Sequence, residues 1–421
     1  MNWMNLIVNF VFWYPAFMSV MWIVGSLIFY FRVERRKPLE LIATPKVSIL
    51  VPCYNEQDTI AESIRRLNEI DYPDYEIIAI DDGSSDKTWE ILTKLSEMNE
   101  KLRVVHIVNN SGKANALYHG LLVSNGEILV CVDADSYLAR DALKYMVPHF
   151  INPKNGERVG AVTGNPRVKN RSSLLSRIQL CEYASIISLI KRTQRTHGKI
   201  MTVSGVVAAF RKRALLDCDL WDKDIITEDV AVTWKLEKKF WDVRYEPRAI
   251  CWMLVPETLK GLVKQRSRWS RGGLEVVGRH LNVFTQWKER RLIPICLEQI
   301  VSTVWAACWL FLFIVSIISL IRYGTFMPYY WKSQFLSLIC VIQFFVAMRL
   351  DKRYDKTITK YCVWAIWYPI LYWYVNAIIA LAALPMTIFR KRKKYAVWKS
   401  PDRGLEKTRK EKKADEQRYA S

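Results

Sequence analysis

The sequence lacks the patterns of cysteine and histidine that hold structural metal ions or disulfide frameworks. Its nine cysteines form no C-x-x-C pair, show no Cys/His spacing typical of a zinc site, and several lie inside apolar runs. Buried, reduced cysteines of this kind are typical of proteins of the cytoplasm or the membrane. The sequence therefore implies neither a zinc site nor a disulfide-stapled fold.

The N-terminus lacks the features of a cleavable secretory signal. The apolar run of residues 4–31 has no basic residue before it and is longer than the apolar region of a signal peptide. A basic cluster follows at once, so the positive-inside rule predicts a retained anchor, with the N-terminus outside and the next domain in the cytoplasm. The cluster consists of Arg32, Arg35, Arg36 and Lys37.

Apolar runs are distributed unevenly and predict several membrane spans around one soluble domain. Three further runs, at 292–321, 335–348 and 361–389, can each enter a hydrocarbon layer about 30 Å thick. We expect the last to turn back near Pro369 or Asn376, so that the basic tail stays in the cytoplasm. The predicted parts are an anchor (1–31), a cytoplasmic domain (32–255), interfacial helices (256–291), a second transmembrane region (292–389) and a basic cytoplasmic tail (390–421).

The formal net charge of +21 would suit a nucleic acid, but the distribution of the charge favours another partner. Basic residues cluster beside the apolar runs and in the tail, where anionic lipid headgroups are nearer. We therefore expect the lipid bilayer as a partner and no nucleic acid. A transporter is the weakest interpretation, because the spans carry few charges of the kind that mark ion pathways.

The soluble part alternates strand and helix patterns. One strand pattern runs from Lys46 and stops at Pro52, a second begins at Tyr75 and ends in acids, and two more follow in LRVVHIVNN and in EILVCVDADS from Glu127, with polar residues and helical runs between them. This alternation indicates an α/β fold with a twisted, mostly parallel sheet and helices on both faces. Ligands of such sheets bind beyond the carboxyl ends of the strands, which is where the polar clusters fall. Residues 173–191 predict an amphipathic helix, either on the membrane surface or in the core of the soluble domain.

The segment VDADS places Asp133 and Asp135 directly after a buried strand. Side chains alternate with period two along a strand, so both carboxylates are expected on one side. Two carboxylates suit a hard divalent cation that bridges a nucleotide diphosphate. Taken alone, a D-x-D is more often a pair of loop aspartates that cap the next helix.

Three other residues near strand ends offer contacts for a nucleotide. Asp82 can accept the imide N–H of a uracil, and Tyr54 can lie against the base. Lys113, at a predicted helix start, offers an ammonium group to phosphate. Each also has an ordinary explanation, because Asp-Gly is common in turns and an exposed lysine is usually solvated.

Two later segments complete the set of candidate residues. In ITEDVAVTWKL, Asp229 can serve as the general base for a sugar hydroxyl, although acids at a helix start also simply favour the helix dipole. In KQRSRWSRGG, Gln265, Arg268 and Trp269 lie within about one helical turn. Arg268 could hold a pyrophosphate and Trp269 could face a sugar ring, while the alternative is a basic amphipathic helix on the membrane.

Together and in this order the motifs D-D-G, D-x-D, T-E-D and Q-x-x-R-W resemble the processive, inverting family-2 glycosyltransferases, which make cellulose, hyaluronan and related polymers. The resemblance implies a GT-A-like fold and a divalent metal, Mg or Mn. It implies contacts with uridine for Asp82, metal binding for Asp133 and Asp135, and the role of base for Asp229. The full set of expected site residues comprises the catalytic Asp229, Glu228 and Asp135, and the substrate-binding Tyr54, Glu56, Asp82, Lys113, Asp133, Gln265, Arg268 and Trp269.

Further segments, among them TGNPRVKNRSSL and TVSGVVAAFRKRAL, are similar to the catalytic subunits of bacterial poly-β-1,6-N-acetylglucosamine synthases. That resemblance implies an inner-membrane enzyme that polymerises N-acetylglucosamine from UDP-N-acetylglucosamine into a biofilm exopolysaccharide and exports the growing polysaccharide. It also implies a small accessory membrane subunit, with cyclic di-GMP as a candidate regulator that would need that partner. The alternatives are a hyaluronan, chitin or cellulose type of synthase and a non-catalytic nucleotide-binding scaffold.

Overall fold

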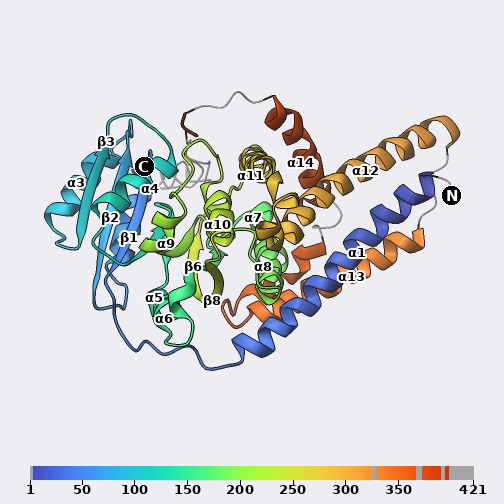
Figure 1. Cartoon of the computed structure of the whole chain (residues 1–421). Coiled ribbons are helices and arrows are strands. Elements are labelled where there is room, and N and C mark those ends of the chain that lie inside the picture. The colour runs from blue at the N-terminus through green and yellow to red at the C-terminus, as the bar shows by residue number, and fades with distance from the viewer. Residues whose placement is uncertain (1–2, 325–329, 367–371, 390–393, 398–421) are drawn as a thin grey trace.

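The computed structural model describes residues 3–324, 330–366, 372–389 and 394–397. A soluble body with the sheet occupies one side of the molecule, and the long helices α1, α12 and α13 project from the other (Figure 1). Helices α7, α8, α10 and α11 lie between the sheet and these projecting helices. This middle layer joins the predicted soluble domain to the predicted membrane region.

One eight-stranded sheet runs through the soluble body, in the order β3-β2-β1-β4-β7-β6-β8-β5. The pairs β1–β2, β1–β4, β2–β3 and β6–β8 are parallel, whereas β4–β7, β6–β7 and β5–β8 are antiparallel. The predicted α/β, GT-A-like sheet is confirmed, and its second half is mixed. The strands are β1 (Val47–Cys53), β2 (Tyr75–Asp82), β3 (Leu102–Ile107), β4 (Ile128–Val132), β5 (Ser136–Leu138), β6 (Val159–Val168), β7 (Val207–Arg211) and β8 (Asp242–Met253).

Helices cover both faces of the sheet, which explains why β1 and β2 are buried along their whole length. In β1, Ile49 and Val51 face the core under α2, α3 and α5, whereas Leu50 faces the core under α4, α9 and α10. The short helix α6 follows α5. The bounds are α2 (Ile60–Leu67), α3 (Thr88–Glu97), α4 (Lys113–Val123), α5 (Ala142–Met146), α6 (Pro148–Ile151), α9 (Lys212–Asp217) and α10 (Glu228–Lys238).

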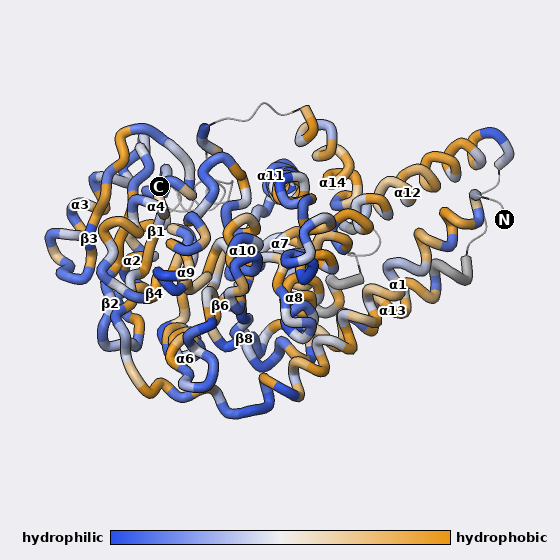
Figure 2. Tube along the Cα trace, viewed as in Figure 1, coloured by the Kyte–Doolittle hydropathy of each residue, from blue (hydrophilic) through white to orange (hydrophobic). Residues whose placement is uncertain are grey.

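Among the residues that the structure describes, three helical segments are long and apolar enough to cross a membrane: Trp3–Glu34, Trp287–Tyr323 and Gln334–Asp351. Hydrophobic residues dominate them (Figure 2), and only 11% of the apolar window in the second is buried inside the protein. The first consists of α1 (Trp3–Phe29) and the π-helical turn η1 (Tyr30–Glu34), the second contains α12 (Ile293–Tyr323), and the third lies within α13 (Tyr330–Asp351). The last apolar run forms the 3₁₀ helix η6 (Ile358–Ile366) and the shorter α14 (Trp373–Ile388); Asn376 lies inside α14, and Pro369 lies outside the described residues.

The helix predicted at 173–191 is mostly buried, which favours the core alternative over the membrane-surface alternative. It consists of α7 (Leu174–Glu182), a π-helical stretch η3 (Tyr183–Ser188) and α8 (Leu189–Thr196), most of whose residues are buried. The predicted interfacial helices are α11 (Leu259–Arg279) and two 3₁₀ turns, η4 (Leu281–Phe284) and η5 (Trp287–Leu292). A π-helical stretch inside a helix is frequent at functional sites.

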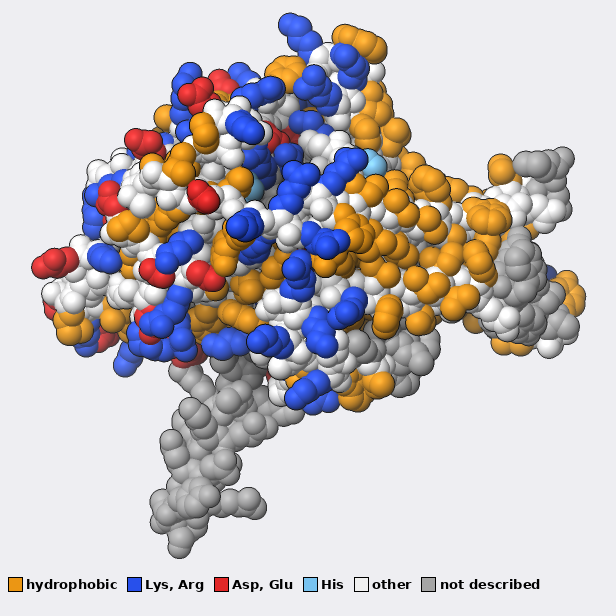
Figure 3. Space-filling model, turned by 90° about the horizontal axis from the view of Figure 1, so that it is seen from below, with side chains coloured by type: hydrophobic (Ala, Val, Ile, Leu, Met, Phe, Trp, Pro, Cys, Tyr) orange, Lys and Arg blue, Asp and Glu red, His pale blue; other side chains and the backbone are white. Residues whose placement is uncertain are grey.

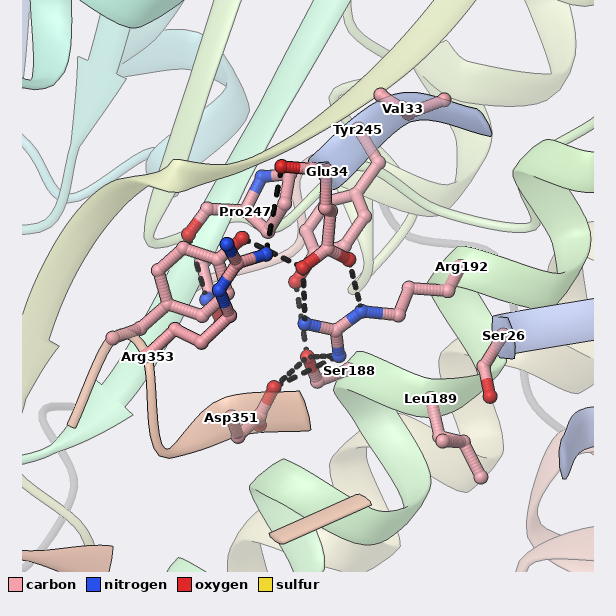
Figure 4. Close-up of polar contacts among 12 residues, drawn as sticks. Ser26, Val33, Glu34, Ser188, Leu189, Arg192, Tyr245, Pro247, Asp351 and Arg353 are labelled. Atoms are coloured by element: carbon pink, nitrogen blue, oxygen red, sulfur yellow. Dashed lines mark hydrogen bonds and ion pairs between the residues drawn. The ribbon is translucent and has the colours of Figure 1, made fainter. Parts of the chain in front are cut away.

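A buried ion cluster ties α8 to the ends of two membrane helices (Figure 4). The Arg192 guanidinium donates to Glu34, which ends η1, at 2.5 Å, and pairs with Asp351, which ends α13, at 2.8 Å. The side chains of all three residues are fully buried. Tyr354 donates to Glu34 at 2.7 Å, and Arg167 of β6 pairs with Asp351 at 2.8 Å. The cluster fixes the soluble body relative to the helices that enter the membrane.

Many basic side chains lie where the soluble body meets the long helices, and the described part of the tail contacts the soluble body. Lys and Arg side chains gather beside the hydrophobic surface of the long helices (Figure 3), where lipid headgroups would lie. In the tail, the Ala396 N–H donates to the Lys223 carbonyl of the soluble body at 2.8 Å. This part of the tail therefore lies against the soluble domain.

Candidate active site

Acidic residues far apart in sequence meet at one edge of the sheet. Asp133 follows β4, Lys113 begins α4, and Glu228 and Asp229 begin α10. The Lys113 ammonium joins them: it lies 2.5 Å from Asp133 Oδ1 and 3.3 Å from Glu228 Oε1. It also donates to the Gly205 carbonyl at 2.9 Å. The predicted convergence at the carboxyl ends of the strands is thus present in the structure.

The two carboxylates of the D-x-D are arranged by a turn. β4 ends at Val132, and the Ser136 N–H donates to the Asp133 carbonyl at 2.9 Å, so the chain bends across residues 133–136. The expectation that strand alternation places both carboxylates on one side is therefore wrong, because the two residues lie in a turn. The two carboxylates are still close enough to interact. Burial raises the pKa of Asp133, the charge of Asp135 adds to this effect, and the Lys113 ammonium opposes it.

The donor set of this turn fits a divalent cation that shares its ligands with a substrate. Among the described residues, no group of three or more His, Cys, Asp or Glu side chains could hold a metal ion. Mg²⁺ and similar cations are commonly held by one or two carboxylates together with substrate phosphates. Asp133 and Asp135 supply two carboxylates. The Lys113 ammonium lies against Asp133, which shows that this position stabilises a positive charge.

Lys113 is a buried cation among acids. Burial opposes its charged form, but Asp133 and Glu228 outweigh burial and raise its pKa well above the usual value. The residue therefore remains an ammonium at any physiological pH. It faces the acidic cluster, and the alternative of a solvated surface lysine does not apply.

Asp229 has the properties of a general base that operates near neutral pH. Burial and the neighbouring Glu228 raise its pKa to about 6, while Lys113 and Arg268 act in the opposite direction. Its Oδ2 accepts the Gly205 N–H at 3.1 Å, and its Oδ1 accepts the Val230 N–H at 2.9 Å. Bases with a pKa near the working pH are the most effective, and these two bonds fix the orientation of the carboxylate.

Asp82 is tied to the loop before Lys113. Its two oxygens accept the N–H groups of Ser111 at 3.0 Å and Gly112 at 2.7 Å, and burial raises its pKa. The carboxylate thus shapes the loop that delivers Lys113. Its neighbour Asp81 points to the other face and lies 2.8 Å from His106 Nδ1.

The first loop places Tyr54 and Glu56 differently. Tyr54 follows β1, one residue beyond the pairing of Cys53 with Asp81, and is half-buried beside the edge that carries Asp82. Glu56 is buried, and its carboxylate accepts the Thr59 hydroxyl at 2.7 Å at the start of α2. Through this bond, Glu56 helps to hold the start of α2.

The residues of the Q-x-x-R-W segment lie on α11 and divide between two environments. The charge of Arg268 acts on Asp229, so this side chain faces the acidic cluster. Trp269 packs on the apolar cluster under α7 and η6, with the Arg266 guanidinium 4.2 Å from its ring. Gln265 is buried. The helix is held close to α10, because a Cβ on Gly272 would lie 2.3 Å from the Thr227 side chain.

Two residues near the cluster were missed by the sequence reasoning. Lys191 of α8 is buried, and the charge of Asp229 acts on it. Tyr183 of η3 is buried within reach of the charges of Arg268 and Asp135. In the sequence, Lys191 stands in the basic run KRTQR and resembles a solvated surface residue, so no local signal distinguishes it.

Comparison with known sequences agrees with these motifs. The family described as "Glycosyltransferase like family 2" matches residues 45–272. A poly-beta-1,6-N-acetyl-D-glucosamine synthase of Staphylococcus epidermidis is 43% identical over 413 residues, which cover 94% of this chain and 98% of the relative. A protein of the same name from Staphylococcus aureus (strain MSSA476) is 44% identical over 410 residues, with the same coverage.

A solved structure shares the fold. The mannosyltransferase PcManGT from Pyrobaculum calidifontis, in complex with GDP-Man and Mn2+, superimposes with a TM-score of 0.60 at 19% sequence identity. The match covers 91% of this chain and 100% of the other.

Proposed function

The chain belongs to the family-2 glycosyltransferases, and from that membership we propose that it polymerises N-acetylglucosamine from UDP-N-acetylglucosamine into a β-1,6-linked polysaccharide. The observation that carries the proposal is the convergence of Asp133, Glu228 and Asp229 on the Lys113 ammonium. The names and near-complete coverage of the staphylococcal relatives support the sugar and the linkage. The sugar and the linkage are thus proposed from the relatives, whereas the fold supports glycosyl transfer in general.

In the proposed reaction, the donor lies at the carboxyl edge of the sheet with its diphosphate near Lys113 and Arg268. A primary hydroxyl of the acceptor approaches the anomeric carbon from the side opposite the diphosphate, and Asp229 Oδ2 or Oδ1 takes its proton as the new bond forms. The carbon–oxygen bond to the diphosphate breaks in the same step. A single displacement converts an α-linked donor into a β-linked product, so no covalent nucleophile is needed.

The proposal includes a divalent cation held by Asp133 and Asp135 together with the diphosphate. Such a cation would neutralise the charge that builds on the leaving nucleotide. Lys113 shares that task from the protein side, because its ammonium stays charged and already contacts Asp133. Glu228 shares the Lys113 ammonium with Asp133 and, as a neighbouring negative charge, helps to keep the pKa of Asp229 near neutrality.

We place the enzyme in the bacterial inner membrane, with the catalytic domain in the cytoplasm. The three apolar helices, the basic residues beside them and the return of the tail to the soluble domain all favour this orientation. In the described part of the chain, three apolar helices and the shorter α14 form the candidate membrane region, and we expect export of the polymer to need an accessory membrane subunit. Cyclic di-GMP, if it regulates the enzyme, would act through that partner.

Product analysis tests the proposal. Membranes that contain the protein are incubated with radiolabelled UDP-N-acetylglucosamine and Mg²⁺ or Mn²⁺, and the polymer is digested with glycosidases of known linkage specificity. We expect a polymer that a β-1,6-specific N-acetylglucosaminidase degrades. Incorporation of another sugar, or a product with the linkage of hyaluronan, chitin or cellulose, would replace the proposed substrate, and absence of any transfer would favour a nucleotide-binding scaffold.

A further inference from the structure

Lys191 is a buried lysine with an unusual environment. Its side chain belongs to α8, the residue is 5% exposed, and its ammonium donates to the Thr163 hydroxyl at 3.2 Å. Within the part of the chain that the structure describes, no carboxylate forms an ion pair with it. Burial of an ammonium without an ion pair is costly, so such a residue is a candidate for a function.

The contact with Thr163 leads directly to the candidate base. The Thr163 hydroxyl oxygen also accepts the Ser204 N–H at 2.8 Å. The next residue, Gly205, donates its N–H to Asp229 Oδ2 at 3.1 Å and accepts from Lys113 through its carbonyl. Lys191 therefore fixes the hydroxyl that holds the Ser204–Gly205 peptide against Asp229.

The two cations that favour ionisation of Asp229 in the free enzyme also have other negatively charged partners. Glu228 beside it on α10 opposes its ionisation, whereas Lys113 on α4 and Arg268 on α11 favour it. Lys113 is shared with Asp133 and Glu228, and both cations are assigned to the diphosphate in the proposed reaction. Once a nucleotide diphosphate binds, these two cations are engaged by phosphate, and the bound anion itself opposes the charge on Asp229.

Lys191 lies on a different element from these two cations. Its ammonium lies above the Tyr245 ring of β8, 6.0 Å from the ring centre, and against Thr163 of β6. Burial lowers its pKa to about 8, and Asp229 is the carboxylate whose charge opposes that shift. Lys191 is thus a buried cation that lies against β6 and β8, and Asp229 is the acid of the cluster whose charge acts on it.

The backbone that carries Lys191 is held firmly. The neighbouring Arg192 is the centre of the buried ion cluster with Glu34 and Asp351 (Figure 4). Its guanidinium also donates to Ser188, whose hydroxyl lies 3.0 Å from the Tyr245 hydroxyl. The position of the Lys191 ammonium is therefore fixed by the same helix that joins the soluble body to the membrane helices.

We propose that Lys191 is a positioning residue for Asp229, which keeps the carboxylate ionised when the anionic donor is bound and holds the Ser204–Gly205 peptide against it. The inference rests on the proposed function, because it needs Asp229 as the base. It adds a residue outside the recognised motifs to the machinery of the transfer step. A neutral substitute for Lys191 is expected to weaken catalysis near neutral pH, through Asp229 and without loss of nucleotide binding.

The pH dependence of polymer synthesis tests this proposal in the full-length protein in membranes. The wild-type rate is expected to rise with pH through about 6, as Asp229 loses its proton. Lys191→Met removes the positive charge, so the pKa of Asp229 rises and the acid limb moves to higher pH. Lys191→Arg keeps a positive charge at the same place, so the acid limb stays where it is in the wild type.

The outcomes separate this inference from its rivals. A Lys191→Met enzyme with wild-type activity at every pH would overturn it. A Lys191→Met enzyme that loses the same fraction of activity at every pH would assign Lys191 a purely structural role, and loss of UDP binding would assign it to the donor. If wild-type membranes transfer a sugar other than N-acetylglucosamine, the substrate proposal fails, and the pH series is run with that sugar.

Discussion

The close contact of α11 with α10 gives the sharpest prediction, because two adjacent glycines on α11 differ completely in their surroundings. A methyl group at Gly272 would lie 2.3 Å from the Cγ2 and Oγ1 atoms of Thr227 and 2.8 Å from its Cβ. A methyl group at Gly273 would meet nothing within 4 Å. Gly272→Ala is therefore a steric perturbation, and Gly273→Ala is its matched control in the same helix.

The size of the effect follows from the geometry. Carbon atoms pack at about 3.5–4.0 Å, so the added methyl must move α11 and Thr227 apart by about 1 Å. Such overpacking costs about 1–3 kcal/mol of stability, partly offset by the about 0.5–1 kcal/mol that Ala gains over Gly in a helix. Arg268 lies one turn earlier on α11 and Asp229 lies two residues after Thr227, so their relative position shifts by a similar distance. A misplacement of about 1 Å can cost about 10²-fold in rate.

The assay combines polymer synthesis in membranes with the melting temperature of the purified protein. We expect Gly272→Ala to fold and to lose about 10²-fold in activity. Gly273→Ala should keep wild-type activity and gain about 0.5–1 kcal/mol of stability. Equal activities for the two variants would refute the argument that close contact between α10 and α11 positions the site.

Three further predictions concern the acids and the ion cluster. Asp229→Asn should keep UDP binding and lower polymer synthesis by at least about 10²–10⁴-fold, because the base is lost; normal yield would remove the assignment. Asp135→Ala should weaken nucleotide binding only when Mg²⁺ or Mn²⁺ is present, which titrations with and without EDTA would show; equal weakening in both would argue against a metal role. Arg192→Met should destabilise the fold by about 3–5 kcal/mol, because the buried carboxylates of Glu34 and Asp351 lose the guanidinium that they share, whereas Arg65→Met on the exposed face of α2 should leave the melting temperature unchanged.

The sequence determined the order of strands and helices and the identity of most acids in the cluster. Each acid follows a strand or begins a helix, and the carboxyl ends of parallel strands meet at one edge. That rule places Asp82 and Asp133 together without coordinates. The chain pattern could not reveal the turn at residues 133–136, because a turn and an extended strand both place two aspartates near one point.

Only the tertiary structure decided the partners of charged side chains on the middle helices. Lys191 and Arg192 are adjacent in the same basic run, yet the first faces Asp229 and the second faces Glu34 and Asp351. Whether a charged side chain is buried depends on which other parts of the chain pack around its helix. The partner of Arg192 on α13, Asp351, lies 159 residues further along the chain (351 − 192 = 159). Local periodicity is a property of one segment, so it can predict that α8 is a helix but cannot predict which charges that helix meets.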